Sequence, residues 1–316
     1  MFELLQSHKS MLKPKKDGTG GSRRLTIRMD SSLAHVFFCL AVFIHVGKCS
    51  AGEPFASVFT TKNWGNIVTD DSTGNVQAIL TRETGVEFET MKTYLGGSFS
   101  VKAKLVPGNS AGTVSAFYLI SYDNNHDEID MEFLGNVSGQ PYVLHTNLFA
   151  NGVGKREQQV YLTFDPTANY HTYSIIWNHR LITWSVDGTP IRVHKNIEAQ
   201  APGSFPFSKG LHVAGCIYEG STWATRGGRD PINWNDAPFV VNFQNFDFDA
   251  CEVQNGDASS CRGNYGNWWD GPQYQSLSSD QINQLRSYRQ QYQIYDYCTD
   301  KSRNPTPPIE CQYNEP

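Results

Sequence analysis

The chain has 316 residues, of which 39% are hydrophobic and 13% aromatic, enough for a packed core in one large or two small domains. Its 27 Gly, 15 Pro, 15 Tyr and 18 Phe favour a β-rich protein. Residues 1–51 do not look like part of the folded domain. They contain 8 of the 26 Lys/Arg and 3 of the 31 Asp/Glu residues, so 18 basic and 28 acidic residues remain in the rest of the chain. This balance argues against nucleic acids and anionic membranes as partners and fits a neutral polymer better.

The first 51 residues carry targeting features. Residues 1–28 are basic and poor in apolar side chains, and we expect them to be disordered. Residues 29–51 are interpreted as a signal peptide, because Leu33–Val46 is apolar apart from Ser- and His-type interruptions and the small-residue cleavage pattern Cys49–Gly52 follows. This apolar run is too short for a comfortable membrane span. Met29 is then the natural start, and an uncleaved signal anchor or a long basic leader is the alternative.

Short alternating runs separated by turn residues extend from Phe55 to about Asn245. They predict strands near Phe99–Leu105, Val114–Ile120, Tyr173–Trp177, Ile182–Val186 and Val240–Phe243, with turns at Pro107-Gly108-Asn109 and Asp187-Gly188. Many short strands at this spacing predict an all-β sandwich or jelly roll, which we place over residues 52–248.

The most informative segment is His126–Leu134, where acidic and apolar residues alternate. As a strand it places the carboxylates of Glu128, Asp130 and Glu132 on one face and three apolar side chains on the other. Like charges in a low-dielectric groove cannot all ionise freely, so at least one pKa should rise, which separates an acid from a base or nucleophile. The Glu128 and Glu132 backbones lie about 13 Å apart, and on a concave strand the carboxyls can approach about 5 to 5.5 Å, as in a retaining glycosidase.

Two other interpretations of the acidic run stay open on the residues alone. A solvated strand face would normally mix Thr, Lys or Ser among its carboxylates to avoid self-repulsion. A calcium site would show an Asp/Asn/Gly loop spacing, which this run lacks. The run favours a glycosidase site without excluding either alternative.

Polar and aromatic residues beyond the run are candidates for a sugar-binding groove. His145 and Asn147, two apart on the next predicted strand, face one side and suit hydrogen bonds to hydroxyls, with a polar network in the sheet as the alternative. Aromatic faces stack on pyranose rings, and four tryptophans lie in Gly- and Asn-rich stretches: Trp223, Trp234, Trp268 and Trp269. For each of them, packing in the core is the alternative. The sequon at Asn136 predicts a glycan. No phosphate-cradling loop, nucleotide motif or nucleophile elbow stands out, so we expect no cofactor.

The composition changes at Cys251, and we interpret residues 249–316 as a C-terminal extension. Four cysteines of a secreted chain allow three connectivities here, of which the local pairs, Cys251 with Cys261 and Cys298 with Cys311, are the simplest. Cys216 is left over as a buried thiol. Zinc would require Cys-x-x-Cys spacing, which is absent, so no metal is expected.

The extension also contains a helix signal. Ser278 and Gln281 form a capping-box pattern, and apolar or aromatic residues recur at helical spacing after it, at Ile282, Leu285, Tyr288 or Arg289, and Tyr292. We predict an amphipathic helix over residues 280–292 that packs on the sandwich near the disulfides.

The segment His126–Asn136 closely resembles the signature of plant xyloglucan endotransglucosylase/hydrolases, within glycoside hydrolase family sixteen. The resemblance continues through His145–Asn147, Arg156–Gln158, Asp187–Arg192, Trp223–Gly228 and Tyr297–Asp300, in order, and covers nearly all of residues 55–311. It implies a curved β-jelly-roll whose concave face binds a β-1,4-glucan backbone.

The resemblance also implies roles for the acidic residues. The first glutamate of the signature, here Glu128, is the nucleophile that forms a covalent glycosyl-enzyme. The second, here Glu132, protonates the leaving oxygen and then activates the acceptor. Asp130 between them hydrogen-bonds the nucleophile and holds its orientation and charge.

Substrate contacts of the family carry over to a wider set of positions in this chain. These are Glu132, His145, Thr146, Asn147, Lys155, Arg156, Glu157, Thr222, Trp223, Gly227 and Arg303. Lys155 stands where the family commonly has an acidic residue, and Thr222 stands where an Asp is common. The segment Gly215–Gly220, expected to border the acceptor side, departs as well, which leaves the fine substrate preference open.

The function implied is that of a secreted, monomeric enzyme of the cell wall and apoplast with xyloglucan donor and acceptor chains as its partners. It cuts one chain and passes the glycosyl group to another, or to water when the acceptor is held less well than water over the intermediate. The alternatives are the same chemistry on mixed-linkage glucan or cellulose, and a non-catalytic glucan-binding lectin. A lectin would retain polymer after Glu128→Ala and show no turnover.

Overall fold

The computed structural model describes residues 46–49, 53–61, 63–263 and 265–314, all within the unit Phe43–Pro316. The predicted basic extension over residues 1–28 lies outside the described residues. Of the predicted signal peptide only β1 (Val46–Cys49) is described, and its backbone pairs with strand β15 (Phe239–Glu252). Within the described part of the chain, no helix is both long and apolar enough to cross a membrane.

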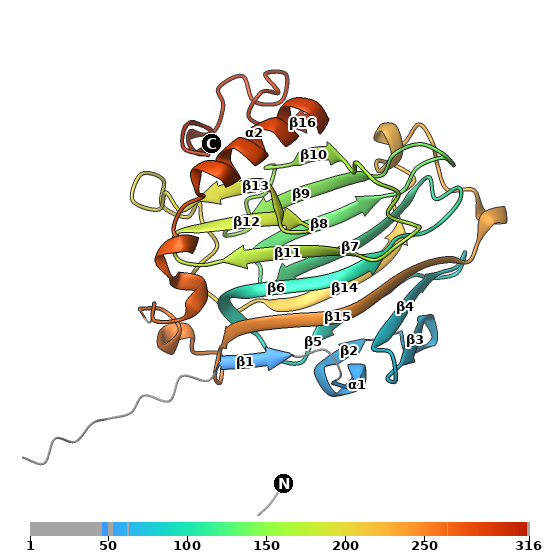
Figure 1. The fold of residues 1–316 in the computed structure, drawn as a ribbon, viewed down its shortest axis with the longest axis horizontal. Coiled ribbons are helices and arrows are strands. Elements are labelled where there is room, and N and C mark those ends of the chain that lie inside the picture. Colours follow the sequence, from blue (N-terminus) through green and yellow to red (C-terminus); the bar gives the residue numbers. More distant parts are fainter. Residues whose placement is uncertain (1–45, 50–52, 62, 264, 315–316) are drawn as a thin grey trace, which may run out of the picture. The chain divides into compact units, whose positions relative to one another are not determined.

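Two antiparallel sheets of eight strands form the body of this unit (Figure 1). Sheet A has the order β13-β12-β11-β6-β15-β4-β3, with β1 added to β15. Its strands after β1 are β3 (Ile67–Asp70), β4 (Asn75–Leu80), β6 (Tyr94–Lys104), β11 (His171–Trp177), β12 (Leu181–Val186), β13 (Thr189–Lys195) and β15 (Phe239–Glu252).

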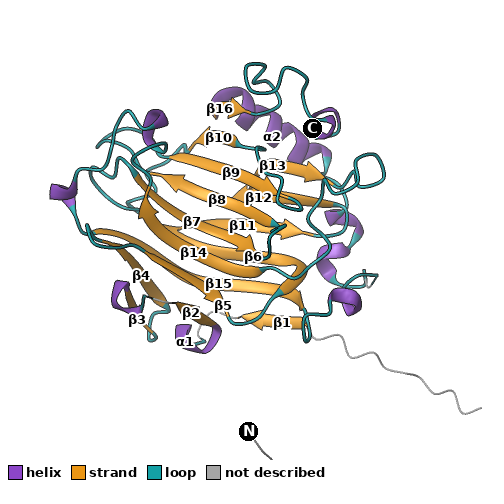
Figure 2. Ribbon diagram, turned by 180° about the vertical axis from the view of Figure 1, so that it is seen from behind, coloured by secondary structure: helices purple, strands orange, loops and turns teal. Residues whose placement is uncertain are grey.

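Sheet B has the order β16-β10-β9-β8-β7-β14-β5-β2, which Figure 2 shows from the other side. Its strands are β2 (Phe59–Thr61), β5 (Val86–Thr90), β7 (Thr113–Ile120), β8 (Glu128–Leu134), β9 (Val143–Phe149), β10 (Gln158–Tyr161), β14 (His212–Glu219) and β16 (Gln293–Asp296). The predicted all-β jelly-roll sandwich is confirmed.

Aromatic and β-branched residues at alternate strand positions fill the space between the sheets. Trp177 and Trp184 from sheet A and Phe117 and Phe133 from sheet B are essentially inaccessible to solvent. Burying each such side chain contributes about 1.5 to 3 kcal/mol. Because alternate residues of the sheet B strands enter this core, the intervening ones must face away from it.

The predicted hairpin turn between β12 and β13 is confirmed. Asp187 and Gly188 have φ angles of 47° and 77°. Positive φ at both central residues is what a two-residue hairpin loop needs to match the right-handed strand twist. At the other predicted turn Gly108 has a φ of 74°.

Among the described residues, the α-helices are α2 (Ser279–Tyr292) and the one-turn α1 (Phe55–Val58). The predicted capping box of α2 is present, since Ser278 Oγ accepts from the Gln281 N–H and the Gln281 side chain accepts from the Ser278 N–H at 2.9 Å. Leu285 is buried against Leu181 and Val193 of sheet A. The predicted helix and its packing on the sandwich are therefore confirmed.

The cysteines pair as the simplest connectivity predicts. Cys251–Cys261 and Cys298–Cys311 are disulfides with sequence separations of 10 and 13 residues. Cys216, on β14, is a buried free thiol. Both disulfides therefore close short loops in the C-terminal region.

Candidate active site

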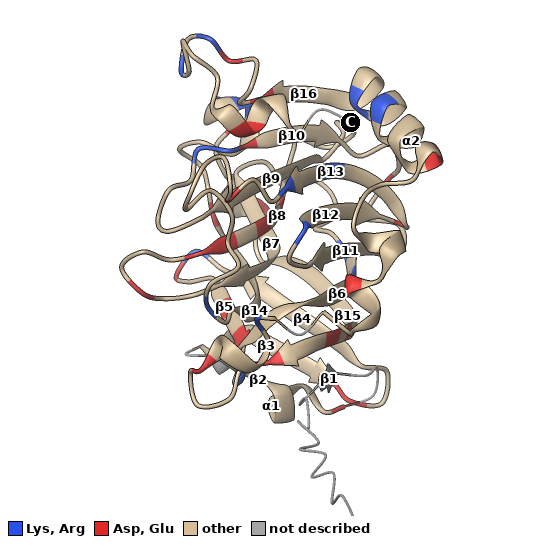
Figure 3. Cartoon of the chain, turned by 90° about the vertical axis from the view of Figure 1, so that its left-hand side faces the viewer, with Lys and Arg blue, Asp and Glu red and all other residues tan. Residues whose placement is uncertain are grey.

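Strand β8 carries its three carboxylates on the face of sheet B that is turned away from sheet A, called here the open face. Ile129, Met131 and Phe133 are fully buried in the core. By strand alternation the acidic side chains point the other way. Figure 3 shows the layers from the side, with β7, β8 and β9 in one and β11, β12 and β13 in the other, and acidic residues in red. The predicted separation of an acidic and an apolar face is confirmed.

Glu128 begins the row and is partly buried. His126 Nε2 lies 3.3 Å from Glu128 Oε2, and the His126 ring packs on Phe149 with 4.7 Å between centroids. Burial raises the pKa of Glu128, while the hydrogen bond with Asp130 and the nearby His126 oppose that rise. Two neighbours thus favour the ionised form of a desolvated carboxyl, a state suited to nucleophilic attack.

Asp130 is the most buried of the three acids. Burial raises its pKa well above the usual range, and the charges of Glu128 and Glu132 raise it further. In its protonated form the Asp130 carboxyl donates to Glu128, which fixes the position of that neighbour. The Asp130 carbonyl accepts from Trp184 Nε1 at 3.0 Å, and the Arg192 guanidinium lies 4.7 Å from the centre of the Trp184 ring. Sheet A therefore holds the backbone of the acidic strand.

Glu132 ends the row as a group that titrates near neutrality. Burial, aided by the charges of Glu128 and Glu157, raises its pKa to about 7. Tyr218 Oη on β14 donates to Glu132 Oε1 at 2.9 Å and limits this rise, because the bond favours the ionised form. A carboxyl with this pKa gives up and regains a proton readily at neutral pH.

His145 lies opposite Glu132 on β9 and is neutral at neutral pH. Burial lowers its pKa to about 4. Gln159 Nε2 lies 3.0 Å from His145 Nδ1, and because an amide nitrogen only donates, Nδ1 accepts and the ring proton sits on Nε2. That Nε2 is 3.6 Å from Glu132 Oε2, too far for a hydrogen bond but aimed at the same carboxyl. The predicted placement of His145 beside the acidic row is confirmed.

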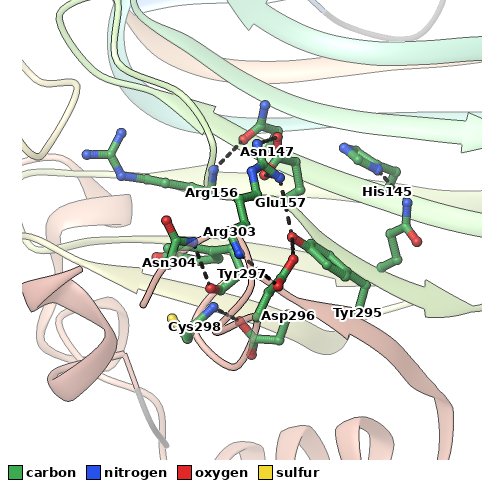
Figure 4. Close-up of polar contacts among 12 residues, drawn as sticks. His145, Asn147, Arg156, Glu157, Tyr295, Asp296, Tyr297, Cys298, Arg303 and Asn304 are labelled. Carbon is green, nitrogen blue, oxygen red and sulfur yellow. Dashed lines mark hydrogen bonds and ion pairs between the residues drawn. The ribbon is translucent and has the colours of Figure 1, made fainter. Parts of the chain in front are cut away.

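A second polar group lies beyond β9, where the C-terminal segment reaches sheet B (Figure 4). Arg303 holds the Glu157 carboxylate in a fork, with nitrogen–oxygen distances of 2.7 and 2.8 Å, and also donates to Tyr295 Oη at 3.3 Å. Asn147 pairs with Asp130 across β8 and β9, and its Oδ1 accepts from the Arg156 N–H. The structure thus brings Glu157, Arg303 and Asn147 to the side of β8 that faces β10 and β16.

Two side chains of the expected contact set do not reach the open face. Thr146 pairs with Met131 in the sheet, points inward, and its Oγ1 accepts from Arg192 at 2.9 Å. Arg156 is buried and donates from Nε to Glu310 at 2.7 Å. The alternation of β9 and a buried ion pair hold both side chains inside the protein, and the expected contact of these two residues with substrate stays a prediction.

The remaining candidates lie in loops or, for Gly227, at the end of a short 3-10 helix (Thr225–Gly227). Lys155, with φ of 65°, Thr222 and Gly227 are exposed. Asn136 is half-buried after β8, and its Nδ2 donates to the Pro141 carbonyl at 2.9 Å. The loops therefore leave these four positions open to solvent at least in part.

The four candidate tryptophans lie in different environments. The Trp223 ring lies 5.7 Å from the His145 ring in an edge-on arrangement. Trp269 belongs to the core, Trp234 packs partly against it, and Trp268 is exposed. Trp223 is thus the tryptophan of this set that borders the acidic row.

Several residues of the site were not predicted from the sequence. His126, Tyr118, Gln159 and Tyr218 all contact or face the acidic row or its partners. Alternation within each strand gives their facing, but the pairing of β14 with β7 brings Tyr218 to Glu132 from 86 residues away. No local signal reports such a pairing.

Comparison with known proteins agrees with this geometry. The profile of glycosyl hydrolases family 16 matches residues 55–236, and that of the xyloglucan endo-transglycosylase C-terminus matches residues 263–311. A probable xyloglucan endotransglucosylase/hydrolase, protein 5 of Arabidopsis thaliana, is 42% identical over 288 residues, which are 90% of this chain and 98% of the relative. The chain belongs to the xyloglucan endotransglucosylase/hydrolases of family 16.

Another xyloglucan endotransglucosylase and the solved structure of a β-glucanase extend the comparison. Xyloglucan endotransglucosylase protein 34 of Populus tremula x Populus tremuloides is 46% identical over 237 residues, 75% of this chain and 80% of that protein. The Bacillus licheniformis β-glucanase structure superposes with a TM-score of 0.53 at 21% identity, over 65% of this chain and 98% of that one. The last likeness shows the fold alone.

Proposed function

We propose that the protein cleaves the β-1,4-glucan backbone of xyloglucan and transfers the glycosyl group to a second xyloglucan chain or to water. The observation that carries the proposal is the acidic row of β8, where Asp130 bonds Glu128 and Glu132 has a pKa of about 7. The family membership and the names of the relatives support xyloglucan as the substrate.

In the first step Glu128 attacks the anomeric carbon of the donor. The bond from that carbon to the leaving oxygen breaks, and Glu132 gives its proton to this oxygen, so that a neutral sugar hydroxyl departs. Asp130, protonated, donates to Glu128 and keeps the attacking oxygen in place. The Tyr218 hydrogen bond stabilises the carboxylate that Glu132 becomes.

In the second step the ionised Glu132 takes a proton from the acceptor hydroxyl. The acceptor oxygen then attacks the anomeric carbon, the ester to Glu128 breaks, and Glu132 is protonated again. Two displacements at one carbon retain its configuration. The same sequence with water as the acceptor is hydrolysis.

The acceptor is assigned to the side of β8 that carries β9, β10 and the C-terminal segment. There the forked pair of Glu157 and Arg303, the neutral His145 and the edge of Trp223 supply charged and neutral hydrogen-bonding groups and an apolar ring. An acceptor held by these groups excludes water from the intermediate, which favours transfer over hydrolysis. Gly215–Gly220 was expected to border this side; residues 215–219 belong to β14, and the Gly220 carbonyl at the end of the segment accepts from the Trp223 N–H at 3.0 Å.

Incubation with xyloglucan and a labelled xyloglucan oligosaccharide tests the proposal. Label should enter the polymer, and Glu128→Ala should abolish both incorporation and new reducing ends. Mixed-linkage glucan and cellulose serve as competing donors in the same assay. A preference for either would contradict the substrate, and polymer retention without turnover by the unaltered protein would indicate a lectin.

We also propose that residues 29–51 direct secretion to the cell wall and apoplast and that the mature protein is monomeric. The catalytic domain then ends near residue 248 and the extension begins near residue 249, within the long strand β15. Sequencing the N-terminus of the secreted protein tests this, since a terminus at Ala51 or Gly52 is expected.

A further inference from the structure

The imidazole of His126 reaches the first carboxylate of the acidic row from just outside strand β8. His126 Nε2 lies 3.3 Å from Glu128 Oε2. A carboxylate only accepts hydrogen bonds, so the proton that serves this contact is on Nε2. The distance is at the long end of the hydrogen-bond range, and such contacts often tighten when substrate binds. The contact joins one oxygen of Glu128 and does not occupy the other, Oε1.

An aromatic neighbour holds the His126 ring in position. The ring packs on Phe149 with 4.7 Å between the ring centres and 35° between the planes. Phe149 pairs with Glu128 across β8 and β9, so the ring that supports His126 stands beside the carboxylate that His126 contacts. A Cβ at Gly154 would lie 2.4 Å from the Phe149 ring, so the backbone there packs closely on it. The imidazole is therefore packed in place, with 31% of its side chain exposed.

Hydrogen bonds also fix the backbone that carries His126. The His126 carbonyl accepts from the Gly152 N–H at 2.8 Å, and Asp127 Oδ1 accepts from the Asn151 N–H at 2.7 Å. Asp127 itself is buried. The segment before β8 is thus tied to the turn that follows β9, and both the ring and the backbone of His126 are held relative to Glu128.

The other titratable groups that face Glu128 are acidic or neutral, apart from a second histidine one strand further away. Among the described residues, His126 is the one whose side chain forms an ion-pair contact with Glu128 within 4.0 Å. The groups from its own and the neighbouring strands are Asp130, Glu132, Glu87, Tyr118, Cys216 and His212, the last separated from Glu128 by Ile120 of β7. His126 is therefore placed to offset the negative charge that an attacking Glu128 must carry.

We propose that His126 is a positioning residue for the nucleophile, which holds Glu128 Oε2 so that Oε1 is the oxygen that attacks the anomeric carbon. An electron pair of Oε1 forms the new bond while the bond to the leaving oxygen breaks, and His126 keeps its proton throughout. Oε2 then becomes the carbonyl oxygen of the glycosyl ester and still accepts from Nε2. In the second step this hydrogen bond stabilises the carboxylate that departs. The proposal rests on the proposed function, because that function makes Glu128 the nucleophile.

Two variants separate the hydrogen bond from the packing of the ring. His126→Gln keeps an N–H donor, whereas His126→Leu keeps apolar contact with Phe149 and has no donor. The substrate is an aryl β-glycoside of a xyloglucan oligosaccharide, whose acidic leaving group departs without a proton from Glu132. We expect single-turnover release of the aryl alcohol to be about 10- to 100-fold slower in His126→Leu and only a few-fold slower in His126→Gln. The donor KM should change little in either variant.

The pH dependence is a readout that a purely structural role would not move. Glu128 attacks in its ionised form, so the rate of the first step falls as the pH drops through the pKa of this carboxyl. His126 lowers that pKa through its charge and its hydrogen bond. The acid limb should therefore move to higher pH in His126→Leu. It should move less in His126→Gln, because the amide retains a hydrogen bond.

The matched control is His171→Leu on β11 of sheet A. The His171 ring stacks on Phe164 with 3.7 Å between the ring centres, and its Nδ1 lies 2.7 Å from Asp187 Oδ2, so it repeats both contacts of His126 in the other sheet. This variant should change neither the rate nor the acid limb. Thermal unfolding identifies any variant that has lost its fold. If His126→Leu is one of them, His126→Asn replaces it, because its shorter amide does not reach Oε2.

Unaltered first-step kinetics and an unaltered acid limb in a folded variant without the donor would overturn the proposal, as would equal losses in that variant and in His126→Gln. Failure of the proposed function gives a different result. If aryl release depends on His126 but no labelled oligosaccharide enters xyloglucan polymer, transfer fails and the positioning role stands. If the unaltered protein and the variant without the donor transfer label equally fast, the positioning role is rejected and the function stands.

Discussion

The two sides of the acidic row are built in different ways. On the side of β7, β14 and β5, the polar groups come from adjacent strands of one sheet, so the sheet register fixes them. On the side of β9 and β10, Arg303 arrives on a loop closed by Cys298–Cys311 and meets Glu157 from 146 residues away. The first side is therefore as stable as the sheet, whereas the second depends on a local closure that can be loosened separately.

The row between the two sides should show the largest effect. Glu132→Gln keeps the shape of the side chain and removes the proton that the leaving oxygen needs. We expect kcat on xyloglucan to fall about 10²- to 10⁴-fold. An aryl glycoside with an acidic leaving group should lose much less, and an equal loss on both substrates would argue against Glu132 as the acid.

The side of the acidic row that carries β9, β10 and the Arg303 loop is called here the loop side. Opening its disulfide, Cys298–Cys311, should affect both the stability of the protein and the transfer reaction. Replacing Cys298 and Cys311 by Ser should lower the free energy of unfolding by about 2 to 4 kcal/mol. It should also raise KM for the acceptor and shift the products from labelled polymer to new reducing ends. Denaturant unfolding and the two product assays measure these changes.

The matched control is the other disulfide, replaced at Cys251 and Cys261. Its loss should lower stability comparably, because its loop is of similar length. The acceptor KM should stay unchanged. If both double variants altered the acceptor KM equally, the loop side would have no separate closure.

The forked ion pair should be the specific element of the loop side. Arg303→Lys keeps the charge and loses the planar fork, so we expect the acceptor KM to rise about tenfold with little change in donor KM. Lys301→Ala, an exposed cation of the same loop, should change neither constant. A response to donor rather than acceptor concentration would place Arg303 on the wrong side of the row.

On the side of β7, β14 and β5, Tyr218 should set the pKa of the acid Glu132. Glu132 acts protonated, so kcat for glycosyl-enzyme formation should fall as the pH rises through its pKa of about 7. Tyr218→Phe removes a hydrogen bond that favours the ionised form, so this pKa rises further and the alkaline limb moves to higher pH, by about one unit or less. Tyr161→Phe, an exposed tyrosine on β10, should leave the limb in place; a shift to lower pH in Tyr218→Phe would reverse the assignment.

The smallest effect is expected at the cap of α2. Ser278→Ala should cost about 1 kcal/mol of unfolding free energy, as loss of an N-cap usually does. Donor and acceptor constants should not change. A raised acceptor KM would show that the start of this helix supports the loop side as well.

Local patterns in the sequence were sufficient for the acidic face, the helix and parts of several strands. Alternation over residues 128–134 gave the facing of all three carboxylates, and the capping box gave the start of α2. Alternation also predicts that the Thr146 side chain points into the sandwich, because its neighbours His145 and Asn147 face the open side.

Contacts between residues far apart in the chain could not be predicted from local sequence patterns. Arg156 is buried against Glu310, 154 residues away, and Tyr218 reaches Glu132 only because β14 pairs with β7. The segment 215–219 has no local feature that assigns it to one side of β8. Strand order decides such questions, and it depends on the whole sheet.

The strict alternation along β14 has a consequence for how the enzyme can change. The Cys216 and Tyr218 side chains are on the open face, in the same rows as Glu132 and Leu134 of β8, and Tyr218 is bonded to Glu132, while the Ile217 side chain between them is fully buried in the core. Residues that face the open side and residues that fill the core thus alternate along this strand. Directed evolution that randomises only the outward positions of β5, β7 and β14 should yield new polymer preferences from libraries in which most members still fold.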